Sequence, residues 1–356
     1  MRLKSPNAFL AISFSIFLIA PPQVRAWGNS GHEAVAYVAW QQMTPTARAR
    51  AIELIKLVPT LHSADGSKTI PGYAEFLADL PAGLSQDDQN LYLFMRAATW
   101  PDSVKHQWLH DSDTPPKGRT VEVNIGFTDT SSHGYWHFID SGISTDGSKV
   151  PPAPAPNVVT QTAALRQLIA SDEADLLKAY DLVWLEHLVG DLHQPLHAAE
   201  RYVGGVGDAG GNTVNIKMTT AMNKLFEGTL SKSAPTELHA FWDSLPGEGQ
   251  PAAALAQAAA FGKGLPPASA TASAITDPMK WAAESLAIAK KDVYVAPIGS
   301  GTPPAAASSS AAASTPATGT ASIVTTAYYN TAMKDARKRV ALAGARLAKL
   351  LNENLK

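Results

Sequence analysis

Apolar residues recur at helical spacing along most of this chain, and that pattern favours a fold built from helices. Near the end of the chain, Val340, Ala343 and Leu347 follow one another at spacings of three and four. Helices are predicted over residues 44–58, 86–100, 171–194, 236–245, 251–261, 277–291 and 324–354. Segments with strand character are short, at 121–127 and 213–218. We therefore predict a mainly α protein, a single helical domain with a few short strands.

Capping residues and prolines predict where several of these helices begin and end. Thr44 followed by Pro45 is a typical start, with a side-chain cap and a proline in the first turn. Ser30 and Glu33 have the spacing of a capping box, which would open a helix at the beginning of the mature chain. Pro195 closes or kinks the long helix predicted over residues 171–194.

The first 26 residues have the features of a secretory signal. Two basic residues precede an apolar run over 8–20, and small residues stand at the cleavage positions before Trp27. Cleavage after Ala26 would leave Trp27 with a free α-amine, which together with its own carbonyl can chelate a metal. An export signal and the absence of cysteine predict a secreted or periplasmic protein. No other segment is long and apolar enough to span a membrane.

The charge of the mature chain excludes a protein that holds nucleic acid by a basic surface alone. Without the three basic residues of the signal, 26 basic and 31 acidic side chains remain, a formal charge of −5. An anionic substrate would therefore need bound cations. Residues 299–322 are almost all Ala, Ser, Thr, Pro and Gly, and we expect a low-complexity loop within the domain formed by residues 27–356.

Histidine and aspartate recur at spacings that suit metal ligands. His187 and Asp191 lie four residues apart, and so do His239 and Asp243. Further candidates are His32, Asp102, His137 and His197. Imidazole and carboxylate, with no thiolate in the chain, suit zinc held in open catalytic sites. Any one of these pairs alone would more often be a buried hydrogen-bonded pair; the ordered set predicts a metal centre.

These motifs resemble the S1/P1 nuclease family, whose members are zinc-dependent, prefer single strands and share a fold with zinc phospholipase C. The similarity extends over nearly the whole mature chain. It is carried by Trp27 with the following Gly-His, by Trp-Pro-Asp102, His137-Phe-Ile-Asp140 and His187-Leu-Val-Gly-Asp191-Leu-His-Gln-Pro-Leu-His197, by Gly-Gly-Asn212, and by His239-Ala-Phe-Trp-Asp243.

The resemblance implies three zinc ions. Asp102, His137, His187 and Asp191 would hold the first, and His197, His239 and Asp243 the second. The third would take the amine and carbonyl of Trp27, His32 and a shared Asp191.

The resemblance also implies hydrolysis of the P–O3′ bond of single-stranded RNA and DNA to 5′-nucleotides, with 3′-nucleotides as further substrates and a monomeric enzyme. Asp102 would orient the attacking water, and Lys105 would stabilise charge in the transition state. Phe138 would stack on an unpaired base, and Asp140 would accept hydrogen bonds from its edge.

Two alternatives stay open at this point. A zinc phospholipase C would share the fold and the cluster, although its final acidic ligand is typically glutamate, where this chain has Asp243. A non-enzymatic periplasmic zinc-binding protein would cluster its histidines in loops. Other histidines match no ligand position: His193 is expected in a structural role, and His106, His110 and His133 at the surface or in loops.

Overall fold

The computed structural model describes residues 27–356 except 64, 106–111, 230–233, 248–252 and 300–320. Helices make up 55% of the chain, which confirms the mainly α prediction. The α-helices are α1 (Asn29–Gln42), α2 (Pro45–Ile55), α3 (Tyr73–Ala78), α4 (Gln86–Ala97), α5 (Trp100–Val104), α6 (Val158–Ile169), α7 (Asp175–Asp191), α8 (Thr220–Thr229), α9 (Leu238–Asp243), α10 (Ala254–Lys263), α11 (Ala270–Ser273), α12 (Pro278–Ile288) and α13 (Thr326–Asn354).

Shorter elements connect the helices. They are the 3₁₀ turns η1 (Gly126–Thr128), η2 (Gly134–Trp136) and η3 (Pro195–Ala198) and the π-helical turn η5 (Ala289–Val293). The strands are β1 (Leu61–His62), β2 (Thr69–Ile70), β3 (Gly142–Ser144), β4 (Glu200–Val203), β5 (Val206–Gly207), β6 (Ile216–Met218) and β7 (Ser322–Val324). They pair as β1–β2, β3–β4–β5 and β6–β7, and the β3–β4 and β6–β7 pairs are parallel.

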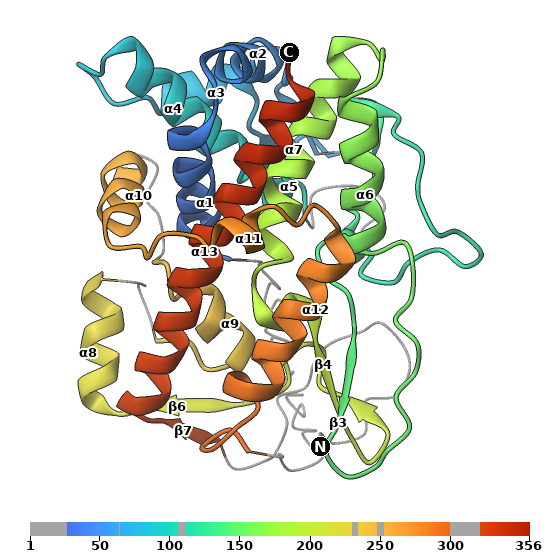
Figure 1. Cartoon of the computed structure of the whole chain (residues 1–356), viewed down its shortest axis with the longest axis vertical. Coiled ribbons are helices and arrows are strands. Elements are labelled where there is room, and N and C mark those ends of the chain that lie inside the picture. Colours follow the sequence, from blue (N-terminus) through green and yellow to red (C-terminus); the bar gives the residue numbers. More distant parts are fainter. Residues whose placement is uncertain (1–26, 64, 106–111, 230–233, 248–252, 300–320) are drawn as a thin grey trace, which may run out of the picture.

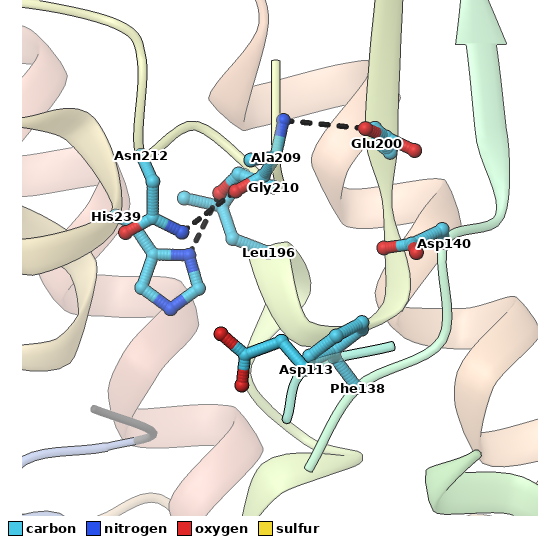
Figure 2. A pocket seen from close by; sticks show the side chains of 9 residues that line it. All are labelled: Asp113, Phe138, Asp140, Leu196, Glu200, Ala209, Gly210, Asn212 and His239. Carbon is cyan, nitrogen blue, oxygen red and sulfur yellow. Dashed lines mark hydrogen bonds between the residues drawn. The ribbon is translucent and has the colours of Figure 1, made fainter. Parts of the chain in front are cut away.

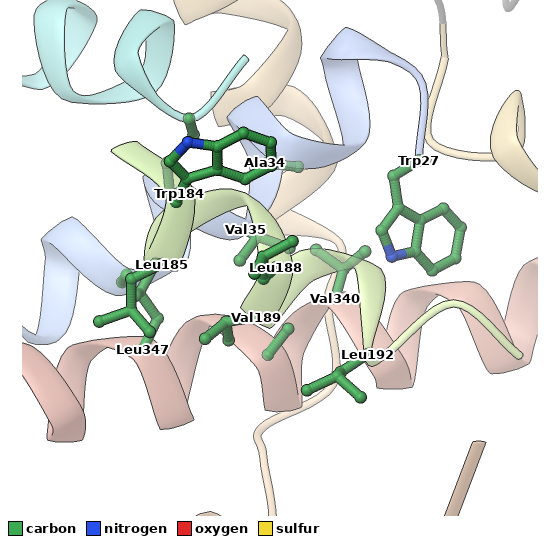
Figure 3. Close-up of a cluster of buried hydrophobic side chains, with 14 of the residues drawn as sticks. Trp27, Ala34, Val35, Trp184, Leu185, Leu188, Val189, Leu192, Val340 and Leu347 are labelled. Atoms are coloured by element: carbon green, nitrogen blue, oxygen red, sulfur yellow. The ribbon is translucent and has the colours of Figure 1, made fainter. Parts of the chain in front are cut away.

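Helix α7 is the central element of the fold. Every residue from Ala179 to Asp191 is buried, as expected of a helix enclosed by others rather than one with a solvent face. Helices α2 and α6 pack against it, and α13 runs alongside both α7 and α1 (Figure 1). Figure 3 shows the core at their junction, where Val35 of α1, Leu188 of α7 and Val340 of α13 lie together. The metal-ligand candidates on α7 are thus held on a rigid support.

The predicted start of a helix at Thr44 is confirmed. The Thr44 side chain accepts a hydrogen bond from the Ala47 N–H and caps α2, which has Pro45 in its first turn. Pro195 begins the η3 turn just after α7 ends. Among the described residues, no helix is both long and apolar enough to cross a membrane. The predicted signal, His106 and His110 lie outside the described residues, as does most of the predicted loop over 299–322.

The capping box predicted at Ser30 and Glu33 is wrong. Helix α1 begins at Asn29, and Gly28 precedes it without a side-chain cap. Both Ser30 and Glu33 are buried, and Glu33 Oε1 accepts a hydrogen bond from Arg96 of α4 at 2.8 Å. The capping-box spacing of Ser30 and Glu33 is therefore produced by two side chains that pack into the interior.

The strand predicted at residues 121–127 is also wrong, because that segment pairs with no strand among the described residues. Its alternation is real but inverted: Glu122 points inward and accepts hydrogen bonds from Tyr135 and Trp136, whereas Val123 is 79% exposed. Hydrogen bonds of the polar side chains hold the segment in place. The alternation of apolar and polar residues therefore arises here without pairing in a sheet.

Other differences concern element length. The helix predicted over 171–194 is shorter, as α7, and the separate helix α6 was not predicted. Of the strand predicted over 213–218, only β6 forms. Ser322, assigned to the low-complexity loop, belongs to β7, which pairs with β6.

Candidate metal centre and adjoining pocket

The structure gathers eight histidine and aspartate side chains into three groups that could each hold a metal ion. The groups are His32, His187 and Asp191; Asp102, His137 and His187; and His197, His239 and Asp243. Within each group, the potential ligand atoms lie within 4.8 Å of one another. His187 belongs to two groups, so those two are adjacent.

Asp191 faces two of the groups at once. Its Oδ2 lies 3.0 Å from His137 Nδ1 and 3.5 Å from His187 Nε2. Its Oδ1 lies 3.4 Å from His32 Nε2, and the His32 ring stacks on His187 at a centroid distance of 3.7 Å. A carboxylate whose two oxygens face different histidines has the geometry to bridge two cations.

Asp102, on the short helix α5, lies at the edge of this arrangement with Lys105. Asp102 Oδ1 is 3.6 Å from His187 Nε2 and 3.0 Å from Lys105 Nζ. Burial alone would raise the pKa of Asp102, but Lys105 and the neighbouring histidines hold it well below its ordinary value. The Lys105 side chain is only 9% exposed, so it is no solvated surface lysine.

Main-chain carbonyls orient three of the imidazoles. The pairs are His187 Nδ1 with Ala98 O at 2.8 Å, His197 Nδ1 with His137 O at 2.7 Å, and His239 Nδ1 with Gly210 O at 2.7 Å. A carbonyl oxygen can only accept, so each Nδ1 carries the hydrogen. Each Nε2 then directs a lone pair at the candidate metal centre, which is the arrangement found in metal-binding histidines.

These lone pairs are unfavourable neighbours without a cation. His197 Nε2 and His239 Nε2 lie 3.1 Å apart, and burial keeps the pKa of His197 well below its usual range. Neither ring nitrogen of the buried His32 has a hydrogen-bond partner among the described residues, and the same holds for Asp191 Oδ1. Burial also raises the pKa of Asp191, as expected for a carboxylate without its counter-charge. The donor set and these atoms fit zinc.

Trp27 lies against two of the elements that carry these groups. Its indole N–H donates to Gly190 O at 3.0 Å on α7, and the next N–H, of Gly28, donates to Asp243 O at 3.0 Å on α9. The beginning of the described chain is therefore held beside both Asp191 and Asp243.

A pocket adjoins the third group. Its lining residues are Asp113, Phe138, Asp140, Leu196, Glu200, Ala209, Gly210, Asn212 and His239, around a cavity of about 170 Å³. Figure 2 shows His239 and Asn212 on one side of this pocket and Asp140 with Glu200 on the other. The two predicted substrate-binding residues, Phe138 and Asp140, thus line one space next to a metal-ligand candidate.

Sequence reasoning missed several supporting residues. A Cβ at Gly190 would lie 2.8 Å from His32 Nδ1, so the close approach of that ring requires glycine there. Gln194 Nε2 donates to Asp243 Oδ1 at 2.7 Å and fixes that carboxylate. Glu200 and Asp113 join the pocket from distant parts of the chain. Gly190 and Gln194 had a signal in the sequence, their place in the motif that runs from His187 to His197.

Two further histidines, His193 and His133, play structural roles. His193 Nδ1 donates to Val189 O at 2.7 Å, and Arg346 donates to its Nε2 at 2.8 Å. His133 lies in a loop, one of the two predicted locations, and not at the surface. His133 is buried, and its Nε2 contacts Asp129 Oδ2 at 2.6 Å.

Comparison with known proteins agrees with this arrangement. A model of the family described as S1/P1 nuclease matches residues 27–356. The chain belongs to the S1/P1 nuclease family. Among its relatives in Arabidopsis thaliana, endonuclease 4 is 26% identical over 230 residues, which cover 62% of this chain and 54% of the relative.

Two further Arabidopsis thaliana relatives have similar identities. Endonuclease 2 is 25% identical over 62% of this chain and 62% of its own length, and endonuclease 1 is 23% identical over 60% and 56%. The matched part thus spans little more than half of the length of these S1/P1 relatives.

Proposed function

We propose that this protein is a zinc-dependent endonuclease that hydrolyses the P–O3′ bonds of single-stranded RNA and DNA to 5′-nucleotides. The observation that carries the proposal is the buried cluster of imidazole lone pairs and carboxylates, which needs cations to be stable. Membership of the S1/P1 nuclease family supports the reaction class, and so does the similarity to three proteins named endonucleases.

Three zinc ions would be held by the groups already described. Asp191 would be shared between the group of Asp102, His137 and His187 and the group of His32 with the amine and carbonyl of Trp27. His197, His239 and Asp243 would hold the remaining ion. When bound, zinc supplies Lewis-acid chemistry: it draws charge from the phosphodiester and lowers the pKa of the attacking water.

The residues of the chain then position the reactants. Asp102 remains ionised and accepts a hydrogen bond from the water, orienting it towards phosphorus. The Lys105 ammonium, 3.0 Å from Asp102, lies where it can stabilise the negative charge that grows on the phosphoryl oxygens. As the P–O3′ bond breaks, the 3′ oxygen leaves and takes up a proton.

Preference for single strands would come from the pocket. Phe138 offers an aromatic face on which a base can stack, and Asp140 offers a carboxyl group to the edge of that base. A base can enter such a pocket only when it is not paired in a duplex. The same pocket would accept 3′-nucleotides, so 3′-nucleotidase activity belongs to the proposal.

The mature chain is proposed to begin at Trp27 after export to the periplasm or the medium, and to act as a monomer. The family match that starts at residue 27 supports this start, as do the contacts of Trp27 with α7 and of Gly28 with α9. A longer amino terminus would block the terminal amine. One residue added before Trp27 should therefore lower the zinc content by one ion per chain, and an unchanged content would refute terminal ligation.

The proposal is tested by nucleotide release from single-stranded RNA and DNA, measured with protein that begins at Trp27. Release should stop after chelation with EDTA, return with added zinc, yield 5′-mononucleotides and be far slower on duplexes. Persistent absence of release in protein with its full zinc content would reject the nuclease and favour another phosphoesterase.

A variant separates chemistry from metal binding. Lys105→Met should lower kcat by about a hundredfold while the zinc content stays that of the parent protein, because Lys105 is assigned to charge stabilisation and not to coordination. A loss of zinc in this variant would contradict that assignment.

A further inference from the structure

The pocket beside the metal centre contains more negative charge than a simple stacking site requires. Three carboxyl groups, those of Asp113, Asp140 and Glu200, line it together with the ring of Phe138. A fourth, Asp208, lies nearby and raises the pKa of Asp140. Among the described residues, no lysine or arginine lines the pocket, and the nearest pairing cation in this cluster is Arg201, whose Nε lies 3.3 Å from Asp208 Oδ2. Asp113, Asp140 and Glu200 therefore share the pocket without a cation in its lining.

The parallel pairing of β3 and β4 holds Asp140 next to Glu200. Gly142 is the register partner of Glu200, and the Glu200 N–H donates to Ser141 O at 3.0 Å. Asp140 directly precedes Ser141, and Figure 2 shows its carboxyl group on the same side of the pocket as that of Glu200. The two acids are therefore held together by main-chain hydrogen bonds rather than by flexible side chains.

The two neighbours differ in their hydrogen bonds. The Glu200 carboxylate accepts hydrogen bonds from the Ala209 N–H at 3.3 Å and from the Tyr202 hydroxyl. The structure gives the Asp140 carboxyl group no hydrogen-bond donor among the described residues. Burial, followed by the charges of Glu200, Asp208 and Asp113, raises the pKa of Asp140 to about 7. His239 lies on the opposite side of the pocket, where its Nδ1–H bonds to Gly210 O.

The protonated and the ionised form of a carboxyl group bind different combinations of donors and acceptors on a base. A protonated carboxyl group has one donor and one acceptor, and each of the four bases offers an adjacent donor and acceptor on its Watson–Crick edge. An ionised carboxylate only accepts, and guanine alone offers two adjacent donors, N1–H and the N2 amino group. We propose that Asp140 reads the base in both forms, accepting any base when protonated and selecting guanine when ionised, and that Glu200 sets the pH of the change.

This inference rests on the proposed nuclease function and assigns Glu200 as a specificity-determining residue that acts through Asp140. The sharpest probe is hypoxanthine, which differs from guanine only by the missing N2 amino group. We compare thymidine oligonucleotides that carry a single central guanine or hypoxanthine, and measure kcat/KM for cleavage beside that base from pH 5 to 8.5.

In the holoenzyme the guanine-to-hypoxanthine ratio should be close to one at low pH and rise about tenfold at high pH, the worth of one added hydrogen bond to a charged group. Glu200→Gln keeps an acceptor for the Ala209 N–H but removes the charge, so the midpoint should move to lower pH. Asp140→Asn offers one donor and one acceptor at every pH, so the ratio should stay near one throughout. Asp87→Asn, an exposed change on α4, controls for net charge and should leave the midpoint unchanged.

A ratio independent of pH in the parent protein, or an unchanged midpoint in Glu200→Gln, would overturn the inference while leaving the nuclease intact. Absence of cleavage of every oligonucleotide would instead reject the proposed function. In that case, calorimetry over the same pH range would give the dissociation constants of 5′-GMP and 5′-IMP. Their ratio would test base selection by the pocket independently of cleavage.

Discussion

Replacing Gly190 with alanine should disturb the metal centre, although the same change in a helix is normally favourable. A Cβ at this position would lie 2.8 Å from His32 Nδ1 and 3.1 Å from its Cε1. The His32 ring also stacks on His187 at 3.7 Å, so a displacement that relieves the new contact disrupts the stacking. Both histidines are metal-ligand candidates, and a shift of several tenths of an ångström alters their common geometry.

Two opposing effects determine the magnitude. Glycine to alanine inside a helix stabilises by about 0.5–1 kcal/mol, whereas overpacking a filled core costs about 1–3 kcal/mol. Overpacking prevails, because the neighbouring atoms belong to a buried ring rather than to a flexible chain end. We expect the free energy of unfolding to fall by about 0.5–2 kcal/mol in the zinc-depleted protein. We also expect the purified protein to hold one zinc ion fewer.

Urea denaturation after chelation measures the first quantity, and plasma mass spectrometry measures the second. Gly264→Ala, at the end of α10, is the matched control, since its Cβ would meet its neighbours only at 3.5 Å or beyond. That variant should keep both the stability and the zinc content of the parent. A Gly190→Ala protein with full zinc content and undiminished stability would refute the steric reasoning.

Two further predictions concern buried charges away from the metal centre. Arg346→Met removes both hydrogen bonds to the half-exposed Glu284 and should lower the free energy of unfolding by about 2–3 kcal/mol, whereas Lys349→Met, on the same helix but in an exposed pair, should cost less than about 0.5 kcal/mol. Equal effects in urea denaturation would contradict this. Burial alone would lower the pKa of His133, but Asp129 and Glu122 raise it above that of the unfolded chain. Its stabilisation is therefore complete below about pH 6.5 and lost as the pH rises through the folded-state pKa, and His133→Asn should abolish that pH-dependent part of the unfolding free energy.

Much of the candidate site could be predicted from the sequence because its chemistry is local. His187 and Asp191 lie one helical turn apart, so their common face follows from helix geometry alone. Imidazole and carboxylate in an ordered set, without cysteine, indicated the type of metal. The helical period likewise predicted the mainly α fold and the length of α13 nearly to the residue.

The sequence-based predictions failed where a local residue pattern was produced by tertiary contacts rather than by the secondary structure that it usually indicates. The spacing of Ser30 and Glu33 is that of a cap, yet Glu33 turns inward to Arg96. The alternation around Val123 is that of a strand, yet its polar side chains are half-buried and its apolar ones are exposed. In both cases a tertiary contact that the local pattern does not specify decided the outcome.

The sequence by itself determined which side chains could bind metal and which helices could carry them, because residue type and helical period are properties of neighbouring residues. Only the tertiary structure decided how these parts act together. It placed the carbonyls that orient His187, His197 and His239, and it left space beside Gly190 for His32. It also paired β3 with β4, which brings Asp140 beside Glu200. Hydrogen bonds, close approach and shared charge act through space, so they depend on the folded chain.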